Sequence, residues 1–194
     1  MLVAAMVGIF WYEGSRGVGG GAVRYTVTGW EEASVNGPQK SGTTDEGAES
    51  VDSVMVNQTL LSCADFVLVW SDDIGAPDNF EFTVTPPMGE PKGQSAANAD
   101  GGDGEITVSF CDLNPQPTAT SASGDDEADA KRRLGEQVGA TGGIGAYNVT
   151  VKLTDAGDQS SPVPGLPAGG TADTSQAWQV KVIYHVHDPM LQAS

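Results

Sequence analysis

The sequence feature that most constrains the fold is the alternation of apolar and polar residues in several short runs. Successive side chains of a β-strand point to opposite faces of a sheet, so such a run buries one face and exposes the other. Seven runs are candidate strands, at residues 23–28, 54–61, 66–70, 80–85, 106–110, 147–153 and 178–186. Residues 66–70 are apolar at every position, which is typical of a central strand covered on both faces. The pattern predicts an all-β chain.

Turn-forming residues separate these runs. The 194 residues include 26 glycines and 11 prolines, which are scattered between the apolar segments without a fixed period. Short strands separated by turns are typical of a β-sandwich, and a chain of this length can bury a substantial core in one domain. We therefore predict a single sandwich domain of about seven to nine strands.

The segments between the runs define the expected domain boundaries. We expect a hydrophobic anchor segment with a glycine-rich spacer at residues 1–21, the sandwich domain at residues 22–188 and a tail at residues 189–194. Within the domain, residues 31–50 and 157–175 are polar and rich in turn formers, which predicts two loops. A third, long loop spans residues 113–145.

The long loop contains a candidate helix at residues 124–138, starting at Asp125. Acidic residues precede basic ones there, in agreement with the helix dipole. We found no internal repeat that would divide the chain into tandem modules.

The N-terminal run Leu2–Tyr12 reads LVAAMVGIFWY and is followed by polar residues and a glycine-rich spacer. A membrane-spanning helix needs about 20 apolar residues, so this run alone is too short to cross a bilayer. Its last three residues are aromatic, as at the interfacial end of a spanning helix. We interpret the run as the outer end of a membrane anchor that begins upstream. A first β-strand or a core-capping segment is the alternative.

The charge balance is strongly acidic. The chain has 26 aspartates and glutamates against nine lysines and arginines, a formal net charge of -17. The basic cluster Lys131-Arg132-Arg133 is surrounded by acidic residues, so we expect no binding to nucleic acid, which requires unopposed positive charge. An acidic surface suits high salt, divalent cations or a cationic partner, or serves solubility alone.

The two cysteines, Cys63 and Cys111, stand at the ends of strand-like runs. In an exported chain this arrangement predicts a disulfide across the sandwich, and two buried free thiols are the alternative. Their spacing does not match a zinc site.

Acidic turns provide a candidate calcium site. Calcium binds six to eight oxygen ligands from carboxylates and carbonyls on flexible loops. Two turns carry suitable residues: Asp72, Asp73 and Asp78 in one, and Asp100, Asp103 and Glu105 in the other. The spacing differs from the EF-hand loop, and aspartate and glycine are also ordinary turn residues.

Two further residue pairs are candidate sites. His185 and His187 are two apart on a strand, so they project to one face, where they could hold a metal with a third ligand or be solvated. The sequons at Asn57 and Asn148 could carry glycans in an exported chain.

Two stretches resemble known families. Residues 145–151, GAYNVTV, are similar to the G-x-Y-x-V-x-V strand of PKD-type and other immunoglobulin-like surface domains. The resemblance implies that Tyr147 packs where the chain enters its penultimate strand, and that residues 177–186 form the last one. Residues 66–73 with 78–80 and 87–89 are similar to jelly-roll and pre-peptidase-like modules of prokaryotic secreted proteins. Both imply an immunoglobulin-like or jelly-roll β-sandwich.

The combination of a hydrophobic N-terminus and one sandwich also resembles archaeal pilin-like and archaellum-associated surface subunits. The sequence has no G-x-S-x-G elbow and no P-loop, so we do not expect an enzyme. We expect a membrane-anchored, extracytoplasmic module with a structural, adhesive or protein-binding role at the cell surface. It would bind other surface proteins or its own copies. The alternatives are a secreted calcium- or carbohydrate-binding module and a filament subunit.

Overall fold

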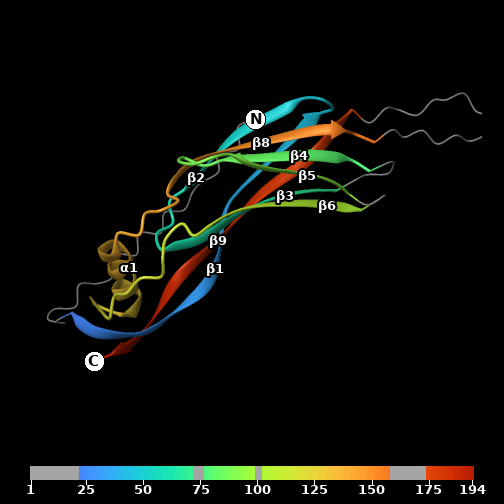
Figure 1. Ribbon diagram of the computed structural model, residues 1–194. Coiled ribbons are helices and arrows are strands. Elements are labelled where there is room, and N and C mark those ends of the chain that lie inside the picture. The colour runs from blue at the N-terminus through green and yellow to red at the C-terminus, as the bar shows by residue number, and fades with distance from the viewer. Residues whose placement is uncertain (1–21, 72–76, 99–101, 158–173) are drawn as a thin grey trace, which may run out of the picture.

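The computed structural model describes residues 22–71, 77–98, 102–157 and 174–194. Nine strands of this part form two antiparallel sheets that face each other (Figure 1). The five-stranded sheet has the order β6-β3-β9-β1-β7 and the four-stranded sheet the order β2-β8-β4-β5. The predicted all-β sandwich is confirmed.

The element bounds follow the chain order. The strands are β1 Val23–Asp45, β2 Glu49–Val56, β3 Leu61–Ser71, β4 Asn79–Thr85, β5 Lys92–Ala97, β6 Asp103–Cys111, β7 Ser121–Gly124, β8 Gly145–Asp155 and β9 Ser175–Ala193. One helix, α1 Glu127–Val138, lies between β7 and β8.

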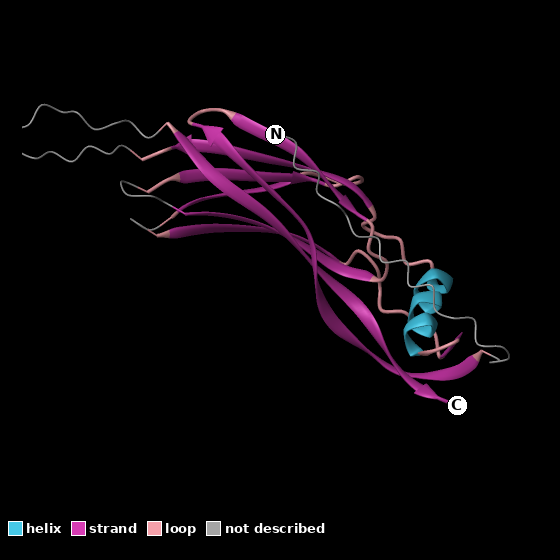
Figure 2. Cartoon of the chain, turned by 180° about the vertical axis from the view of Figure 1, so that it is seen from behind, coloured by secondary structure: helices cyan, strands magenta, loops and turns pink. Residues whose placement is uncertain are grey.

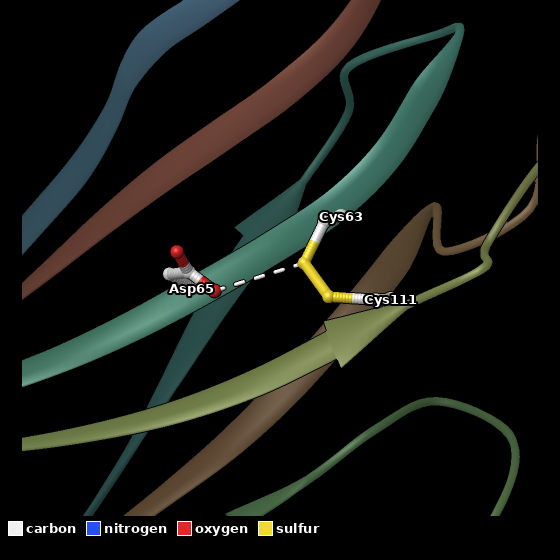
Figure 3. Close-up of side chains that lie close together, drawn as sticks. All are labelled: Cys63, Asp65 and Cys111. Atoms are coloured by element: carbon white, nitrogen blue, oxygen red, sulfur yellow. Dashed lines mark hydrogen bonds between the residues drawn. A yellow bond between two sulfur atoms is a disulfide. The ribbon is translucent and has the colours of Figure 1, made fainter.

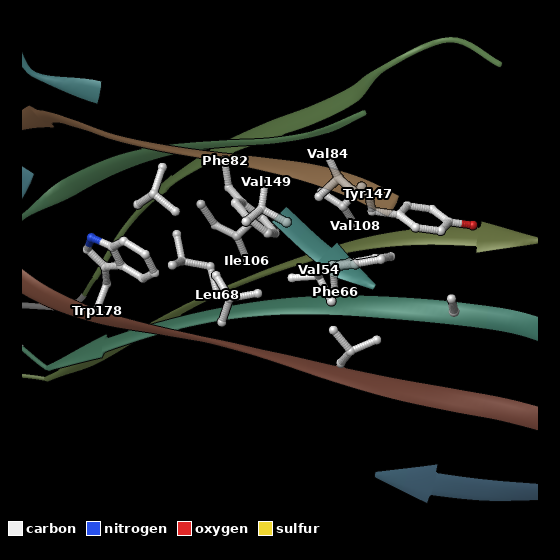
Figure 4. Close-up of a cluster of buried hydrophobic side chains, with 14 of the residues drawn as sticks. Val54, Phe66, Leu68, Phe82, Val84, Ile106, Val108, Tyr147, Val149 and Trp178 are labelled. Atoms are coloured by element: carbon white, nitrogen blue, oxygen red, sulfur yellow. The ribbon is translucent and has the colours of Figure 1, made fainter. Parts of the chain in front are cut away.

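The main core fills the space between the sheets with the inward-facing residues of the alternating runs (Figure 4). The rings of Phe66 on β3 and Tyr147 on β8 lie 4.9 Å apart and join the two layers. Full burial of a large apolar side chain contributes about 1.5–3 kcal/mol, so the alternation is the main source of stability.

The strands β1 and β9 form a ribbon that extends beyond β3 (Figure 2). There α1 packs on β7 and the ribbon around a second, small core of Ala122, Ala130 and Leu134. The helix begins after the N-cap Asp126, whose carboxylate accepts the N–H of Asp129, and ends at Gly139 in the left-handed region. The predicted helix is confirmed, with its first residue at Glu127.

The expectation of a loop at residues 31–50 is wrong. The strand β1 continues to Asp45 and pairs with β9 along its length. Its other edge pairs with β7 only from Val23 to Thr26. The rest of β1 is an edge strand, and most of its side chains are exposed on both faces. It therefore shows no alternation of apolar and polar residues, although its backbone pairs with β9.

Two other boundaries and two further strands also differ from the sequence prediction. Leu61 begins β3 instead of ending the preceding strand, and the expected tail at residues 189–194 is part of β9 as far as Ala193. The strands β5 and β7 were missed. Their sequences, KGQSAA and SASG, contain few large apolar residues, since both are short edge strands.

The two ends of the molecule differ in what they carry. One end, which we call the loop end, holds the last residues of β1, β3, β5 and β8 and the first residues of β2, β4, β6 and β9. At the opposite end lie α1, β7 and the start of β1. We call this the helix end. The last residue is also there, because the N–H of Ser194 donates to the carbonyl of Arg24.

Candidate functional site

The predicted disulfide between Cys63 and Cys111 is present, but it does not cross the sandwich. The two residues are direct partners on the neighbouring strands β3 and β6, with Cα atoms 4.0 Å apart (Figure 3). Both have the outward parity of their strands, because Ala64 and Phe110 beside them point into the core. The bridge therefore lies on the outer face of the five-stranded sheet, with Cys111 exposed.

A polar cluster adjoins the disulfide on the same face. The Nε2 atom of His185 lies 2.9 Å from Oδ2 of Asp65, and its Nδ1 atom lies 3.3 Å from Oγ of Ser34. Glu32 approaches Nδ1 to 3.5 Å and accepts a hydrogen bond from the Ser62 hydroxyl. Residues of β1, β3 and β9 are thus joined by side chains as well as by backbone pairing.

The residue types Ser34, His185 and Asp65 are those of an acyl-transfer triad. Such a site also needs N–H donors aimed at the developing oxyanion. The backbones of His185 and Asp65 belong to strands that are paired on both sides within the sheet. The side-chain interactions of this cluster join β1, β3 and β9.

The two histidines project to one face as expected, but both are partly buried and hydrogen-bonded. The Nε2 atom of His187 lies 3.2 Å from the carbonyl oxygen of Asn114. Sequence reasoning missed the partners Asp65 and Asn114, because 120 and 73 residues separate them from the histidines.

The six candidate calcium ligands do not form one described site. Asp72, Asp73 and Asp100 lie outside the described residues. Asp103 and Glu105 are exposed on the outer face of β6. Asp78 is buried, and its Oδ2 atom accepts a 2.6 Å hydrogen bond from Gln176, which also donates to the carbonyl of Ser71. Asp78 therefore ties the loop end of β9 to the β3–β4 connection.

In the described part of the chain, only Cys63, Asp65 and Cys111 bring three potential metal ligands within 4.8 Å of one another. The two sulfur atoms are already bonded to each other. The Sγ atom of Cys63 lies 3.7 Å from Oδ1 of Asp65, and since a disulfide sulfur carries no hydrogen, this is a packing contact. The trio is not suited to holding a metal while the bridge is intact.

A shallow hollow of about 650 Å³ lies on the outer face of the five-stranded sheet near the loop end. Asp103 and Glu105 of β6 line one side, and Gln179 and Lys181 of β9 line the other. Charges of both signs meet there, so the hollow could accept a polar group of another molecule.

The basic cluster of α1 is neutralised within the fold. Lys131 pairs with Asp188 at 3.0 Å, and Arg132 and Arg133 both pair with Asp129. The N–H of Asp125 and these two guanidinium groups lower the pKa of Asp129 to about 2. These contacts place a carboxylate beside each of the three basic side chains.

Lysines close both open sides of the sandwich. Lys40 of β1 reaches Asp52 of β2 at 3.1 Å, and the N–H of Ser53 together with Lys40 lowers the pKa of that carboxyl. On the other side, Lys92 of β5 donates to the carbonyl of Ser109 on β6 and lies over the Phe110 ring. Such charged side chains are a common protection of sheet edges against pairing with another chain.

The outer face of the four-stranded sheet is different, because it carries few charges. Strand pairing aligns its exposed residues in rows across β2, β8, β4 and β5. Nine uncharged residues form the patch that we call the neutral face: Val51, Ser53, Met55, Thr83, Thr85, Gly93, Ala146, Asn148 and Thr150. The row beside it, toward the loop end, contains Glu49, Lys152 and Glu81.

Two large apolar side chains stand exposed on the neutral face. Val51 is 66% and Met55 60% exposed, both on β2. The candidate glycan acceptor Asn148 lies near the middle of this face, whereas Asn57 is exposed in the connection after β2. The sequence contained the signal for this face, since most outward positions of β2, β4 and β8 carry uncharged residues. It could be recognised only once the strand pairing was known.

Neither the protein-family models nor the curated proteins give a match to this chain, so its function is argued from its own residues. The predicted anchor at residues 1–21 lies outside the described residues. Among the helices of the described part, none has the length and apolar character to cross a membrane.

Proposed function

We propose that this chain is a membrane-anchored module that lies outside the cytoplasm and has a structural, adhesive or protein-binding role at the cell surface. The observation that carries the proposal is the separation of the two ends. In the sequence, the apolar run Leu2–Tyr12 and a short spacer precede Val23, which lies at the helix end, whereas β2, β4, β6 and β9 all begin at the loop end. A tether at Val23 would present the loop end away from the membrane.

The exposed disulfide supports a location outside the cytoplasm. Cys111 is exposed, so a reducing cytoplasm would have access to the bridge, whereas an oxidising exterior preserves it. The buried Tyr147 at the start of the penultimate strand supports an immunoglobulin-like, PKD-type ancestry. The alternative of a secreted calcium-binding module gains less support, because Asp78 is engaged with Gln176.

Membrane fractionation tests the anchor. The full chain should sediment with membranes, and a chain that begins at residue 22 should remain soluble and folded, because the described core lies wholly after that residue. The double variant Val7→Asp/Ile9→Asp should lose membrane association, whereas Val18→Asp in the spacer should retain it. Sedimentation of the shortened chain with lipid would contradict the anchor.

Thiol labelling of whole cells tests the compartment. Cys63 and Cys111 should resist a membrane-permeant maleimide until a reductant is added. Free thiols on the protein in intact cells would contradict an extracytoplasmic location.

A further inference from the structure

We propose that the neutral face of the four-stranded sheet is the surface through which two copies of this chain associate, face to face, about a two-fold axis parallel to the strands. The inference depends on the proposed function in one respect, namely the membrane anchor that concentrates the copies. The surface itself is argued from the charges and the register of the described residues.

The first argument is electrostatic. Two copies that each carry a net charge of -17 repel one another, so they can approach closely only where acidic groups are few. The neutral face is such a region, and it exposes Val51 and Met55. Depletion of charged residues together with exposed apolar side chains is characteristic of the centre of a protein interface.

The second argument is self-complementarity. In a two-fold contact, residue i of one copy meets residue j of the other, and j meets i. An axis between β8 and β4 brings β8 of one copy over β4 of the other, and β2 over β5. The rows of the sheet then place Lys152 opposite the second copy's Glu81, and Thr150 opposite its Thr83.

The same axis matches protruding residues with recessed ones. Val51 and Gly93 occupy opposite ends of one row, which runs through Thr150 and Thr83. Each Val51 therefore faces Gly93 of the other copy. The surface is recessed beside that position, in a hollow of about 470 Å³ that is lined by Asn79, Glu81, Gly93, Gln94, Ser95 and Thr154.

Association through the neutral face is favoured over the addition of a strand from another copy at an edge of either sheet. Lys40 and Lys92 close the sides of the sandwich, whereas no ion pair of the described residues covers the nine positions of the neutral face.

The contact area is small. Four strands spaced about 4.8 Å apart, with about seven residues each, give a sheet area of roughly 440 Å² per copy, which is small for a stable dimer. Tethering in one membrane raises the effective concentration and compensates for this.

Charge exchange between two copies tests the arrangement. Full-length chains carrying either Lys152→Glu or Glu81→Lys, labelled with a donor and an acceptor dye, are measured in lipid vesicles and in detergent. Each variant alone should associate at least about tenfold more weakly than the unmodified chain, because like charges then oppose one another twice. A mixture of the two should recover the original association, since opposite charges meet at both contacts. Recovery cannot arise within one copy.

A pair of valine substitutions provides a matched control. Val51→Asp should weaken association at least about tenfold, because it places a carboxylate over the second copy. Val35→Asp, on the five-stranded sheet at 42% exposure, should leave association unchanged. Thermal midpoints of all variants verify folding.

Three results would overturn the proposal: no concentration-dependent energy transfer for the unmodified chain in either medium, a mixture that associates no better than the single variants, or a glycan at Asn148 of the native protein. Membrane retention is recorded in the same vesicles. If the chains stay in the vesicles but do not associate, the proposed interface is wrong and the anchor stands. If they associate in detergent but do not stay in the vesicles, the anchor is wrong and the interface stands.

Discussion

The indole Nε1 of Trp178 donates a 2.7 Å hydrogen bond to Oγ1 of Thr44, and both side chains are buried. The bond links β9 to the last residues of β1 at the loop end, where the ring of Trp178 also lies against Gly42. It secures the polar end of β1, a segment whose sequence alone indicated a loop.

Replacement of Thr44 should therefore destabilise the fold out of proportion to its size. Thr44→Val keeps the shape but leaves the buried indole N–H without an acceptor, which costs about 1–3 kcal/mol in the free energy of unfolding. Urea denaturation followed by tryptophan fluorescence measures it. Thr43→Val, on the exposed face of the same strand, should change the free energy little, and equal effects of the two variants would contradict this account.

Gly104 should be intolerant of a side chain. The indole of Trp70 packs against its Cα, and a Cβ atom there would collide with the ring. Gly104→Ala should therefore lower the free energy of unfolding by about 1–3 kcal/mol, the usual cost of overpacking a core. Thermal unfolding measures the loss, with Ser109→Ala on the outward side of the same strand as the control. A variant as stable as the parent would show that Trp70 can move aside.

The disulfide should contribute substantially to stability. It joins residues separated by 48 positions, so the chain-entropy model gives about 4 kcal/mol, with measured bridges typically at 2–4 kcal/mol. Cys63→Ala/Cys111→Ala should unfold at correspondingly lower denaturant concentration. A reductant should shift the unfolding midpoint of the parent and leave that of the double variant unchanged. A parent that is insensitive to reduction would contradict the prediction.

Asp129 should make the helix end sensitive to acid. The N–H of Asp125, with Arg132 and Arg133, lowers its pKa from 3.8 to about 2 in the folded state. Because the folded pKa is the lower one, the stabilisation is fully present above about pH 4 and is lost as the pH falls through about 2. Asp129→Asn should therefore be less stable than the parent at pH 7, and the difference should shrink as the pH falls below about 4 and be mostly gone near pH 2.

Denaturant unfolding at a series of pH values, followed by the helical circular-dichroism signal, tests this. Glu90→Gln, on the exposed β4–β5 turn, is the control for a simple change of net charge. A stability difference between Asp129→Asn and the parent that is the same at pH 2 and pH 7 would contradict the prediction.

The alternating runs predicted the inward residues of the main core well. Phe82 and Val84 on β4, and Val149 and Val151 on β8, are all fully buried. The alternation also gives the face of the sheet on which each cysteine lies. Cys63 and Cys111 have the parity opposite to Phe66 and Phe110, so a bridge between them could not cross a core that those rings fill.

Other features could not be read from local patterns. The polar half of β1 is held as a strand by its backbone pairing with β9, about 140 residues away at Lys40 and Val180. The partners of His185 and Asp78 likewise come from distant strands. The neutral face exists only because β2, β8 and β4 pair in one register, which aligns uncharged outward residues that are scattered along the chain.

The sequence by itself determined that this protein is a β-sandwich, which side chains fill its interior and that a helix lies within residues 124–138, because burial periodicity and the order of charges along a helix are properties of neighbouring residues. The tertiary structure alone decided the strand order, the same-sheet position of the disulfide and the surface left without charge. These depend on which distant segments pair and in which register, and that choice is settled by the packing of the whole core rather than by any local run of residues.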